Sequence, residues 1–348
     1  MWASKNYNIS YIAGLLLAMQ TAFKLSILTF IIIFSHLKIG HAVELTPFSV
    51  RNLSPTALVH GLAIAESSKV LPPGDKMGQF SFDLVNNATS DQSLNETIVL
   101  DGETYIVTLS IRYGLSERIQ VGLDLPYIHH SEGFLDSFIS DWHDFFGLPN
   151  GDRNKLPNDQ LNYSYKDEKE GFNVNSEKGG FGDLRANLVY ELFSRKKVSY
   201  AIQFSIKAPT GNAEKLTGSE AWDTSLALMT QYEDNLYSGS YSVWAGIAGN
   251  YLGNGEVLDD RVNDLVANGW LGGGWSPYHW LGLKIQLDSH SSLYDSSLKE
   301  LGDPALIMTL GGSLALTKKT ILDLAFSEDL NVEVSPDIAF HLSLKHTF

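Results

Sequence analysis

The sequence contains no cysteine, which excludes disulfide-stapled folds, thiol nucleophiles and cysteine zinc sites. It is also poor in basic residues, with 25 Lys and Arg against 40 Asp and Glu. The resulting net charge of -15 argues against nucleic-acid binding, which depends on cationic side chains that neutralise phosphates. A hydrophobic fraction of 44% nevertheless indicates an ordered chain that can build a large structure.

Catalytic motifs are also missing from the sequence. We find no Gly-x-Ser-x-Gly elbow, no His-Glu-x-x-His helix, no phosphate loop and no dinucleotide fingerprint. His290 and Ser291 are neighbours, and in a strand they point to opposite faces, so they do not form a catalytic pair. We therefore expect no enzymatic activity and no cofactor.

Acidic residues are absent from residues 1–42, which carry three Lys and an apolar run over Leu25–Phe34. A run of about ten residues suits a secretory signal and is too short for a spanning helix, which needs about 20 residues. A small-x-small ending at Ala42 predicts cleavage there, and Met19 is an alternative start. An uncleaved anchor over residues 9–33 is the other interpretation, although a Lys interrupts it. We predict that the chain is exported.

Beyond the signal, apolar and polar residues alternate in segment after segment, as in Tyr105–Tyr113, Ile119–Tyr127 and Val198–Ile206. This period of two predicts strands with one apolar and one polar face. We predict about twelve strands, near residues 77–88, 103–114, 117–130, 181–194, 196–208, 220–232, 236–252, 262–276, 279–292, 305–317, 320–329 and 336–348.

The connections between these strands alternate in length, and this decides between a soluble sandwich and a membrane barrel. Short turns on one side and long loops on the other are typical of transmembrane barrels, with the turns in the periplasm. The strands also exceed the five or six residues of average globular strands. We therefore predict an all-β protein: a transmembrane antiparallel β-barrel of about 12 strands over residues 43–348, in the outer membrane, with a helix-containing extracellular loop at 131–180. Tight turns are expected at 114–116, 195, 233–235, 277–278 and 318–319, and long loops at 89–102, 131–180, 209–219, 253–261, 293–304 and 330–335.

The final predicted strand carries outward apolar residues at every second position and stops on an aromatic residue. This resembles the terminal strand of bacterial outer-membrane barrels, whose last aromatic residue is read by the barrel-insertion machinery. The expected insertion signal consists of Phe340, Leu342, Leu344 and Phe348.

Short motifs spread over most of the exported chain resemble a bacterial outer-membrane family catalogued as domain of unknown function 3187. The resemblance implies the barrel fold and supplies no activity. It rests on Leu71, Pro72, Pro73, Gly74, Leu100, Asp101, Gly102, Glu103, Arg112, Tyr113, Gly114, Pro126, Gly133, Phe134, Leu135, Asp136, Trp142, His143, Phe146, Gly147, Leu148, Pro149 and Arg153. Features shared more widely among exported barrels, including the group linked to phenol degradation, are Gly182, Asp183, Lys207, Pro209, Thr210 and Gly211.

The predicted loop 131–180 is too long for a simple connector, and its first part has the pattern of an amphipathic helix. Two roles stay open for this helix: a gate across the barrel mouth, or a cap packed on the rim. The candidate gate residues are Phe134, Asp136, Phe138, Asp141, Trp142, His143 and Phe146. His129 and His130 precede the helix, but their spacing to its carboxylates matches no recognised metal motif, so we predict no metal site.

Charged residues on the polar faces of the strands are expected to point into the lumen. They either pair across it and fill the barrel, or line an open path and set its selectivity. The candidate lumen-lining residues are Asp83, Arg112, Asp124, Arg185, Glu191, Lys207, Asp223, Lys284, Asp288, Asp323 and Lys345.

These observations favour a narrow channel or uptake route for a small solute, including an apolar one. A non-conducting barrel with a structural or surface-binding role is the alternative, and an unclassified outer-membrane enzyme ranks third. The expected partners are outer-membrane lipid and lipopolysaccharide, the barrel-insertion machinery and a small solute, and the expected oligomeric state is a monomer.

Overall fold

The computed structural model describes residues 43–146, 153–237, 239–331 and 334–348. The predicted signal peptide, residues 1–42, lies outside this part of the chain. Within the described ranges, no helix has the length and apolar character needed to cross a membrane.

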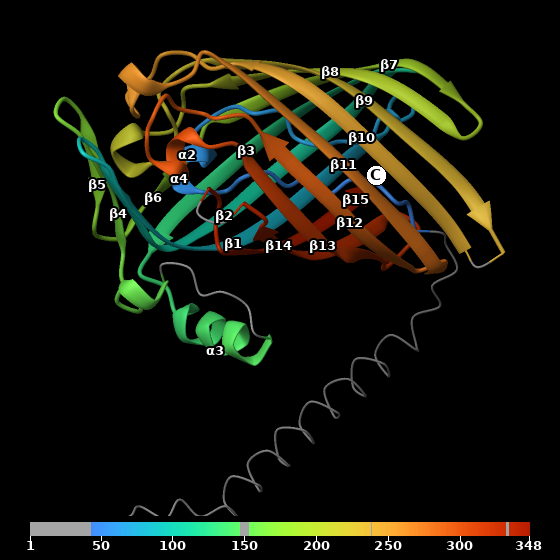
Figure 1. Cartoon of the computed structure of the whole chain (residues 1–348). Coiled ribbons are helices and arrows are strands. Elements are labelled where there is room, and N and C mark those ends of the chain that lie inside the picture. Colours follow the sequence, from blue (N-terminus) through green and yellow to red (C-terminus); the bar gives the residue numbers. More distant parts are fainter. Residues whose placement is uncertain (1–42, 147–152, 238, 332–333) are drawn as a thin grey trace, which may run out of the picture. The chain divides into compact units, whose positions relative to one another are not determined.

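In the described part of the chain, twelve long antiparallel strands form one closed barrel, because the last strand pairs with the first along Met77–Asn86 (Figure 1). Each strand otherwise pairs with its neighbours in sequence, which confirms the predicted fold. The strands are β1 (Lys76–Gln92), β2 (Thr97–Ser116), β3 (Ile119–Ser131), β7 (Leu184–Arg195), β8 (Val198–Ala208), β9 (Asp223–Leu236), β10 (Gly239–Tyr251), β11 (Leu265–Tyr278), β12 (Leu281–His290), β13 (Ala305–Ala315), β14 (Thr320–Asp329) and β15 (Ile338–Thr347).

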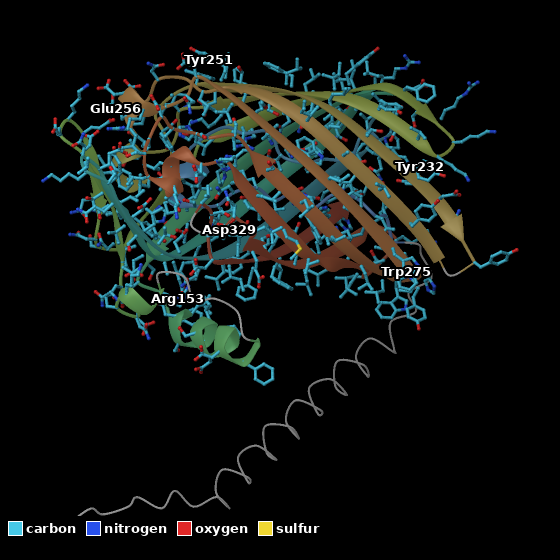
Figure 2. The ribbon with its side chains drawn as sticks, in the orientation of Figure 1. Arg153, Tyr232, Tyr251, Glu256, Trp275 and Asp329 are labelled. Carbon is cyan, nitrogen blue, oxygen red and sulfur yellow. The ribbon has the colours of Figure 1, made fainter. Side chains whose placement is uncertain are left out.

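The faces of the strands are inverted relative to a soluble protein. On β9, the apolar Leu226 and Leu228 are 58% and 50% exposed, whereas the intervening polar face, including Ser225, is buried. Aromatic side chains lie near both ends of the strands, for example Tyr251 on β10 and Trp275 on β11 (Figure 2). An apolar exterior with aromatic residues near its margins matches a surface that contacts lipid.

The barrel has a turn end and a loop end, as the connection lengths predicted. The turn end carries the short connections, including residues 117–118, 196–197, 279–280 and 316–319. One expected long loop, 89–102, is shorter in the structure, because β1 and β2 continue past the barrel and leave only residues 93–96 between them.

The long loop after β3 holds more strand than the sequence predicted. It contains helix α3 (Asp136–Phe146), the 3₁₀ turn η1 (Arg153–Lys155), and the strands β4 (Asn162–Lys166), β5 (Gly171–Val174) and β6 (Lys178–Phe181). β4 pairs with the outer part of β2, and β6 pairs with β3, so the loop extends the wall beyond the barrel. Shorter helical elements elsewhere are α2 (Pro55–Leu58), η2 (Ala213–Lys215), η3 (Asp259–Arg261) and α4 (Lys299–Gly302).

Residues 43–75, which precede β1, run inside the barrel, and the sequence did not predict this. We name residues 43–75 the lumen segment. It starts at the turn end, where the Val43 N–H donates to His279 O at 2.6 Å. It returns there at Gly74, whose N–H donates to Gly114 O at 2.8 Å. Its helix α2 lies at the loop end, so the segment crosses the lumen twice (Figure 1).

Candidate functional site

The ascending half of the lumen segment is bound by polar side chains of the barrel wall. Gln286 on β12 holds both main-chain groups of Phe48, with its oxygen 3.0 Å from Phe48 N and its nitrogen 3.1 Å from Phe48 O. Lys284 donates to Thr46 O at 3.1 Å, and its ammonium lies 3.8 Å from the centre of the Phe48 ring. The lumen-facing amide and ammonium groups therefore replace the hydrogen bonds that this extended backbone lost when it left water.

At the loop end, the turn of the lumen segment packs under the long loops. Val59 and Leu62 belong to an apolar cluster that also contains Leu216, Leu293 and Leu298 from those loops. This cluster packs the turn of the segment against the loops at the loop end.

A buried carboxyl group also contacts the turn of the segment. The Ser54 hydroxyl donates to Glu300 on α4 at 2.9 Å. Burial raises the pKa of Glu300 well above its usual value, because the charged form loses its hydration.

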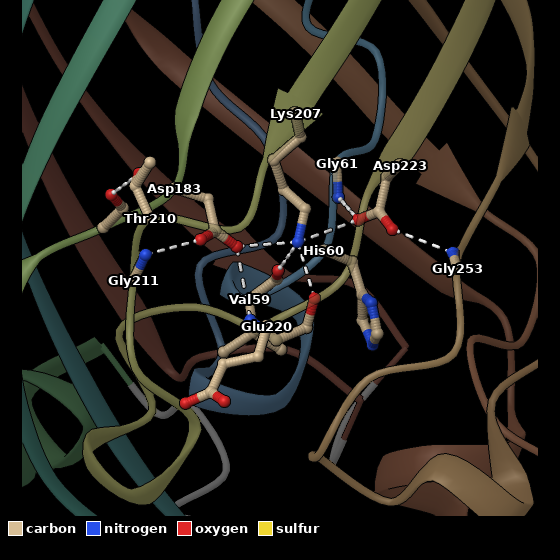
Figure 3. A network of polar contacts seen from close by, with 12 residues as sticks. Val59, His60, Gly61, Asp183, Lys207, Thr210, Gly211, Glu220, Asp223 and Gly253 are labelled. Carbon is tan, nitrogen blue, oxygen red and sulfur yellow. Dashed lines mark hydrogen bonds and ion pairs between the residues drawn. The ribbon is translucent and has the colours of Figure 1, made fainter.

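A buried ion-pair network fixes the turn of the segment to the wall (Figure 3). Lys207 on β8 donates to Val59 O at 2.9 Å and pairs with Asp183 at 2.7 Å and Asp223 at 3.1 Å. Asp223 in turn accepts the N–H of Gly61 at 2.7 Å. A side chain added at Gly61 would place its Cβ 2.7 Å from that of Asp223, so the close approach requires glycine. Wall and segment are thus held by charge-assisted hydrogen bonds on both sides of His60.

The descending half of the segment meets a second charged group at Arg112 on β2. Arg112 forms an ion pair with Glu66 of the segment and one with Asp124 on β3, the latter at 2.7 Å. Asn187 on β7 donates to the other oxygen of Asp124 at 2.6 Å. A wall cation is therefore shared between a wall carboxylate and a carboxylate of the lumen segment.

Cavities lie beside the segment, and two of them adjoin each other. The inner cavity, of about 90 Å³, lies between the segment and the wall formed by β1, β2, β3 and β7. The second, of about 280 Å³, lies near the turn end. Both are lined by Ser49, Glu66, Gln79 and Arg112, so these four side chains form the boundary between them.

The predicted lumen residues divide into two groups in the structure. Residues that line a cavity are Asp83, Arg112, Asp124, Arg185, Lys207 and Lys345. Of the others, Asp223 and Lys284 bind the segment. Asp323 pairs along the wall with Lys284 at 3.2 Å and with the cavity-lining Lys345 at 2.9 Å. Asp288 accepts from Gln286, whereas Glu191, beside a bulge in β7, is only half-buried. That any of them lines a conducting path stays a prediction.

The residues predicted as a gate lie elsewhere. Helix α3 packs on the outer face of the barrel, where Leu135 and Ile139 cluster with Ile338, Leu84 and Phe340. Phe134 and Phe138 are exposed, Asp136 is buried against Arg153, and Asp141 is exposed. The side chains of Trp142, His143 and Phe146 lie outside the described part of the structure. In this structure the lumen segment, and not α3, narrows the lumen. The position of α3 is that of a helix packed on the outside of the barrel.

The two histidines before α3 point to opposite faces of β3. His130 is buried and lies 2.8 Å from the Thr104 hydroxyl, whereas the His129 ring packs beside Tyr105, which faces outward. Among the described residues, no group of three or more His, Asp and Glu is arranged to hold a metal ion.

The fold and its filled lumen can now be compared with known proteins. The family model described as "Protein of unknown function (DUF3187)" matches residues 23–348. The chain belongs to this family. No curated protein matches the sequence of this DUF3187 member significantly.

Solved structures similar to this DUF3187 protein are outer-membrane barrels. The COG4313 outer-membrane channel from Pseudomonas putida F1 has a TM-score of 0.53 and 13% identity, covering 81% of this chain and 98% of that one. The P. putida toluene transporter TodX has a TM-score of 0.34 and 10% identity, covering 80% and 89% of the two chains. The first of these confirms the barrel fold, and the TM-score of the second is too low to support an argument. The likeness in fold agrees with the predicted outer-membrane localisation.

Proposed function

We propose that this protein is an outer-membrane channel for small amphipathic solutes, in which the path runs between the lumen segment and the wall formed by β1, β2, β3 and β7. The observation that carries the proposal is the pair of adjoining cavities, both of which are lined by Ser49, Glu66, Gln79 and Arg112. This wall also bonds the segment, through Arg112 to Glu66 and through Arg185 to Leu62 O, so the proposed path runs where the two cavities adjoin.

The lining of the inner cavity supports the solute class. Leu53, Leu58, Ile106 and Ile128 supply apolar surface, and the charged lining includes the cations Arg51, Arg112, Arg185 and Lys207. A cavity of about 90 Å³ holds several water molecules but no drug-sized ligand. Passage of a solute therefore requires the Glu66–Arg112 pair to separate or the segment to shift, and a solute with an apolar body and a polar head would match both surfaces.

The apolar packing at the loop end favours a second candidate, a non-conducting barrel. Val59 and Leu62 of the segment are buried in the apolar cluster formed with the long loops. In this case the barrel is a rigid platform for its external loops. An enzymatic role is the third candidate, and assays of the purified protein on lipids and peptides test it.

Planar-bilayer recording of residues 43–348 separates the first two candidates, after a heat-dependent gel shift has shown that the barrel is folded. We expect small discrete steps from the intact chain and larger steps from the Glu66→Ser/Arg112→Ser double variant, because both long side chains leave the boundary between the cavities. Lys197→Ser, which alters an exposed ion pair with Asp234, is the matched control and is expected to leave the steps unchanged.

A liposome-swelling assay tests the solute class. Benzoate is expected to enter faster than arabinose, a polar probe of similar size. Silence from the intact chain, from the double variant and from a chain lacking residues 44–70 would contradict the channel and support the non-conducting barrel.

A further inference from the structure

The outward faces of β1 and β2 change from apolar to polar at one level. Leu84 faces Tyr105 across the strand pair, and two residues further towards the loop end Asn86 faces Glu103. The Tyr105 hydroxyl donates to Glu103 at 2.7 Å. A tyrosine with its ring on the apolar side and its hydroxyl on the polar side is typical of the edge of a membrane-facing surface.

Helix α3 is tied to the wall at this same level. Glu103 accepts the N–H groups of Phe134 and Leu135 at 2.8 and 2.6 Å. Gly133, with φ of +81°, leaves space for this carboxylate, since a Cβ there would lie 2.1 Å from Glu103 Cδ. Asn86 donates to Asp136 in the first turn of the helix at 3.0 Å.

A buried cation completes this attachment. Arg153 pairs with Asp136 at 2.5 Å and with Asp337 at 2.6 Å, and its side chain is only 2% exposed (Figure 2). The start of the helix is therefore fixed in height and direction by buried polar groups that would be costly to leave unpaired.

One side of the helix rests on the apolar exterior of the barrel. Leu135 and Ile139 are buried against Leu84, Phe340 and Ile338, so they continue the apolar surface of β1 and β15. The next side of the helix carries two aromatic residues with large exposed fractions. Phe138 is 49% exposed and Phe145, seven residues on and thus on the same side, is 82% exposed.

We propose that α3 is an interfacial membrane helix, whose exposed Phe138 and Phe145 insert among the acyl chains of the outer-membrane lipid beside β1 and β15. The occupant follows from continuity: these rings extend the same apolar surface, Leu84, Phe340 and Leu342, that faces lipid along the strands. Amphipathic helices of this kind lie in the interface with their apolar side in the acyl-chain boundary. The proposal requires the barrel to be in a membrane and does not depend on whether its lumen conducts.

Depth-dependent quenching in lipid vesicles tests this proposal, and the absence of cysteine makes single-site labelling clean. The variants Phe138→Cys and Phe145→Cys carry an environment-sensitive fluorophore in vesicles that contain chain-labelled nitroxide lipid. Leu344→Cys on the outward face of β15 is the lipid-exposed reference, and Leu94→Cys at the fully exposed tip between β1 and β2 is the water-exposed reference. Ser137→Cys, an exposed neighbour on the same helix, is the matched control.

We expect lipid nitroxide to quench the labels at Phe138 and Phe145 to at least half the extent seen at Leu344, and aqueous iodide to quench them several-fold less than at Leu94. The label at Ser137 should respond mainly to iodide. Quenching of the Phe138 and Phe145 labels by iodide as at Leu94 would overturn the proposal, because the helix would then stand in water. Protection from both quenchers would also overturn it, because protein, such as a second copy of the chain, would then cover the surface. Correct quenching at Leu344 and Leu94 shows in each preparation that the barrel is folded.

Discussion

Replacing Lys207 with Met tests whether the lumen segment is held by buried charge. The substitution removes the ammonium that bridges Val59 O, Asp183 and Asp223 and keeps most of the side-chain volume. The carboxylates are 5% and 0% exposed at the side chain, so they stay buried without their cation. Removal of one partner from a buried ion pair costs about 3–5 kcal/mol.

The expected loss lies at the lower end of that range, about 3 kcal/mol, because main-chain donors still stabilise both carboxylates. Asp223 keeps the N–H groups of Gly61 and Gly253 at 2.7 and 2.9 Å, and Asp183 keeps that of Gly211 at 2.7 Å. The assay is urea unfolding in lipid vesicles, followed by tryptophan fluorescence. Lys197→Met, at an exposed ion pair, is the control and should cost about 0–1 kcal/mol.

Two further observations identify the cause of this loss. Protease added to folded Lys207→Met should cut within residues 43–75 faster than in the parent, because the turn of the segment has lost one of its two anchors to the network. Adding Asp183→Asn and Asp223→Asn to Lys207→Met should recover part of the stability, since no uncompensated charge is left buried. The reasoning would be refuted by a loss equal to that of Lys197→Met, or by carboxylate substitutions whose effects simply add to that of Lys207→Met.

Three other outcomes follow from the structure. Glu300→Gln should stabilise the protein above the ordinary carboxyl pKa of about 4.5 and leave its stability nearly unchanged at lower pH. The pKa of Glu300 is raised in the folded state, so the parent loses stability as pH rises from the unfolded-state pKa through the folded-state pKa. Unfolding free energies that change in parallel with pH for both proteins would contradict this. Gln286→Ala should expose the lumen segment to protease and destabilise the protein by about 1–3 kcal/mol, because both main-chain groups of Phe48 lose their partner. An unchanged cleavage rate would argue against the role of the Gln286 side chain. Phe348→Ala should slow barrel assembly several-fold in an insertion assay while the unfolding midpoint changes little, since the Phe348 side chain is 67% exposed in the folded barrel; equal assembly rates would count against the predicted insertion signal.

Strand positions followed closely from the sequence because a barrel wall has a simple rule: every second residue faces lipid. Tyr105–Tyr113 and Ile119–Tyr127 alternate in this way, and both segments lie in strands of the structure, β2 and β3. The predicted long loop at 89–102 was wrong, because β1 and β2 stay paired beyond the barrel, where β4 pairs with β2. Val85–Thr89 and Leu100–Thr104 are buried at every position, so the alternation that marks the barrel strands is missing there.

The lumen segment could not be predicted in the same way. Residues 43–75 have no strand or helix period, because their backbone is bound by side chains such as Gln286 and Lys207 that lie far away in sequence. One signal was nevertheless present. A stretch of more than thirty residues with many apolar positions, including Phe48, Leu53 and Leu62, separates the predicted signal from the first strand, and such residues need burial.

The placement of α3 was open for a related reason. Its amphipathic pattern predicted the helix correctly but did not say which apolar surface the helix meets. The decisive contacts come from Glu103 and Asn86, polar residues at outward positions of strands, where the alternation rule expects apolar ones. Exceptions to a regular pattern therefore marked the site at which the loop is attached.

Thiol modification during current recording is the direct test of whether solutes pass between the lumen segment and the wall at Gln79. Gln79 lines both cavities, and the chain has no cysteine of its own. We expect a charged thiol reagent to reduce the single-channel current of Gln79→Cys by at least half. The current of Ser242→Cys, a buried position that lines a different cavity beside the segment, should stay unchanged. A Gln79→Cys current that is insensitive to the reagent, while mass spectrometry shows complete modification, would contradict this path.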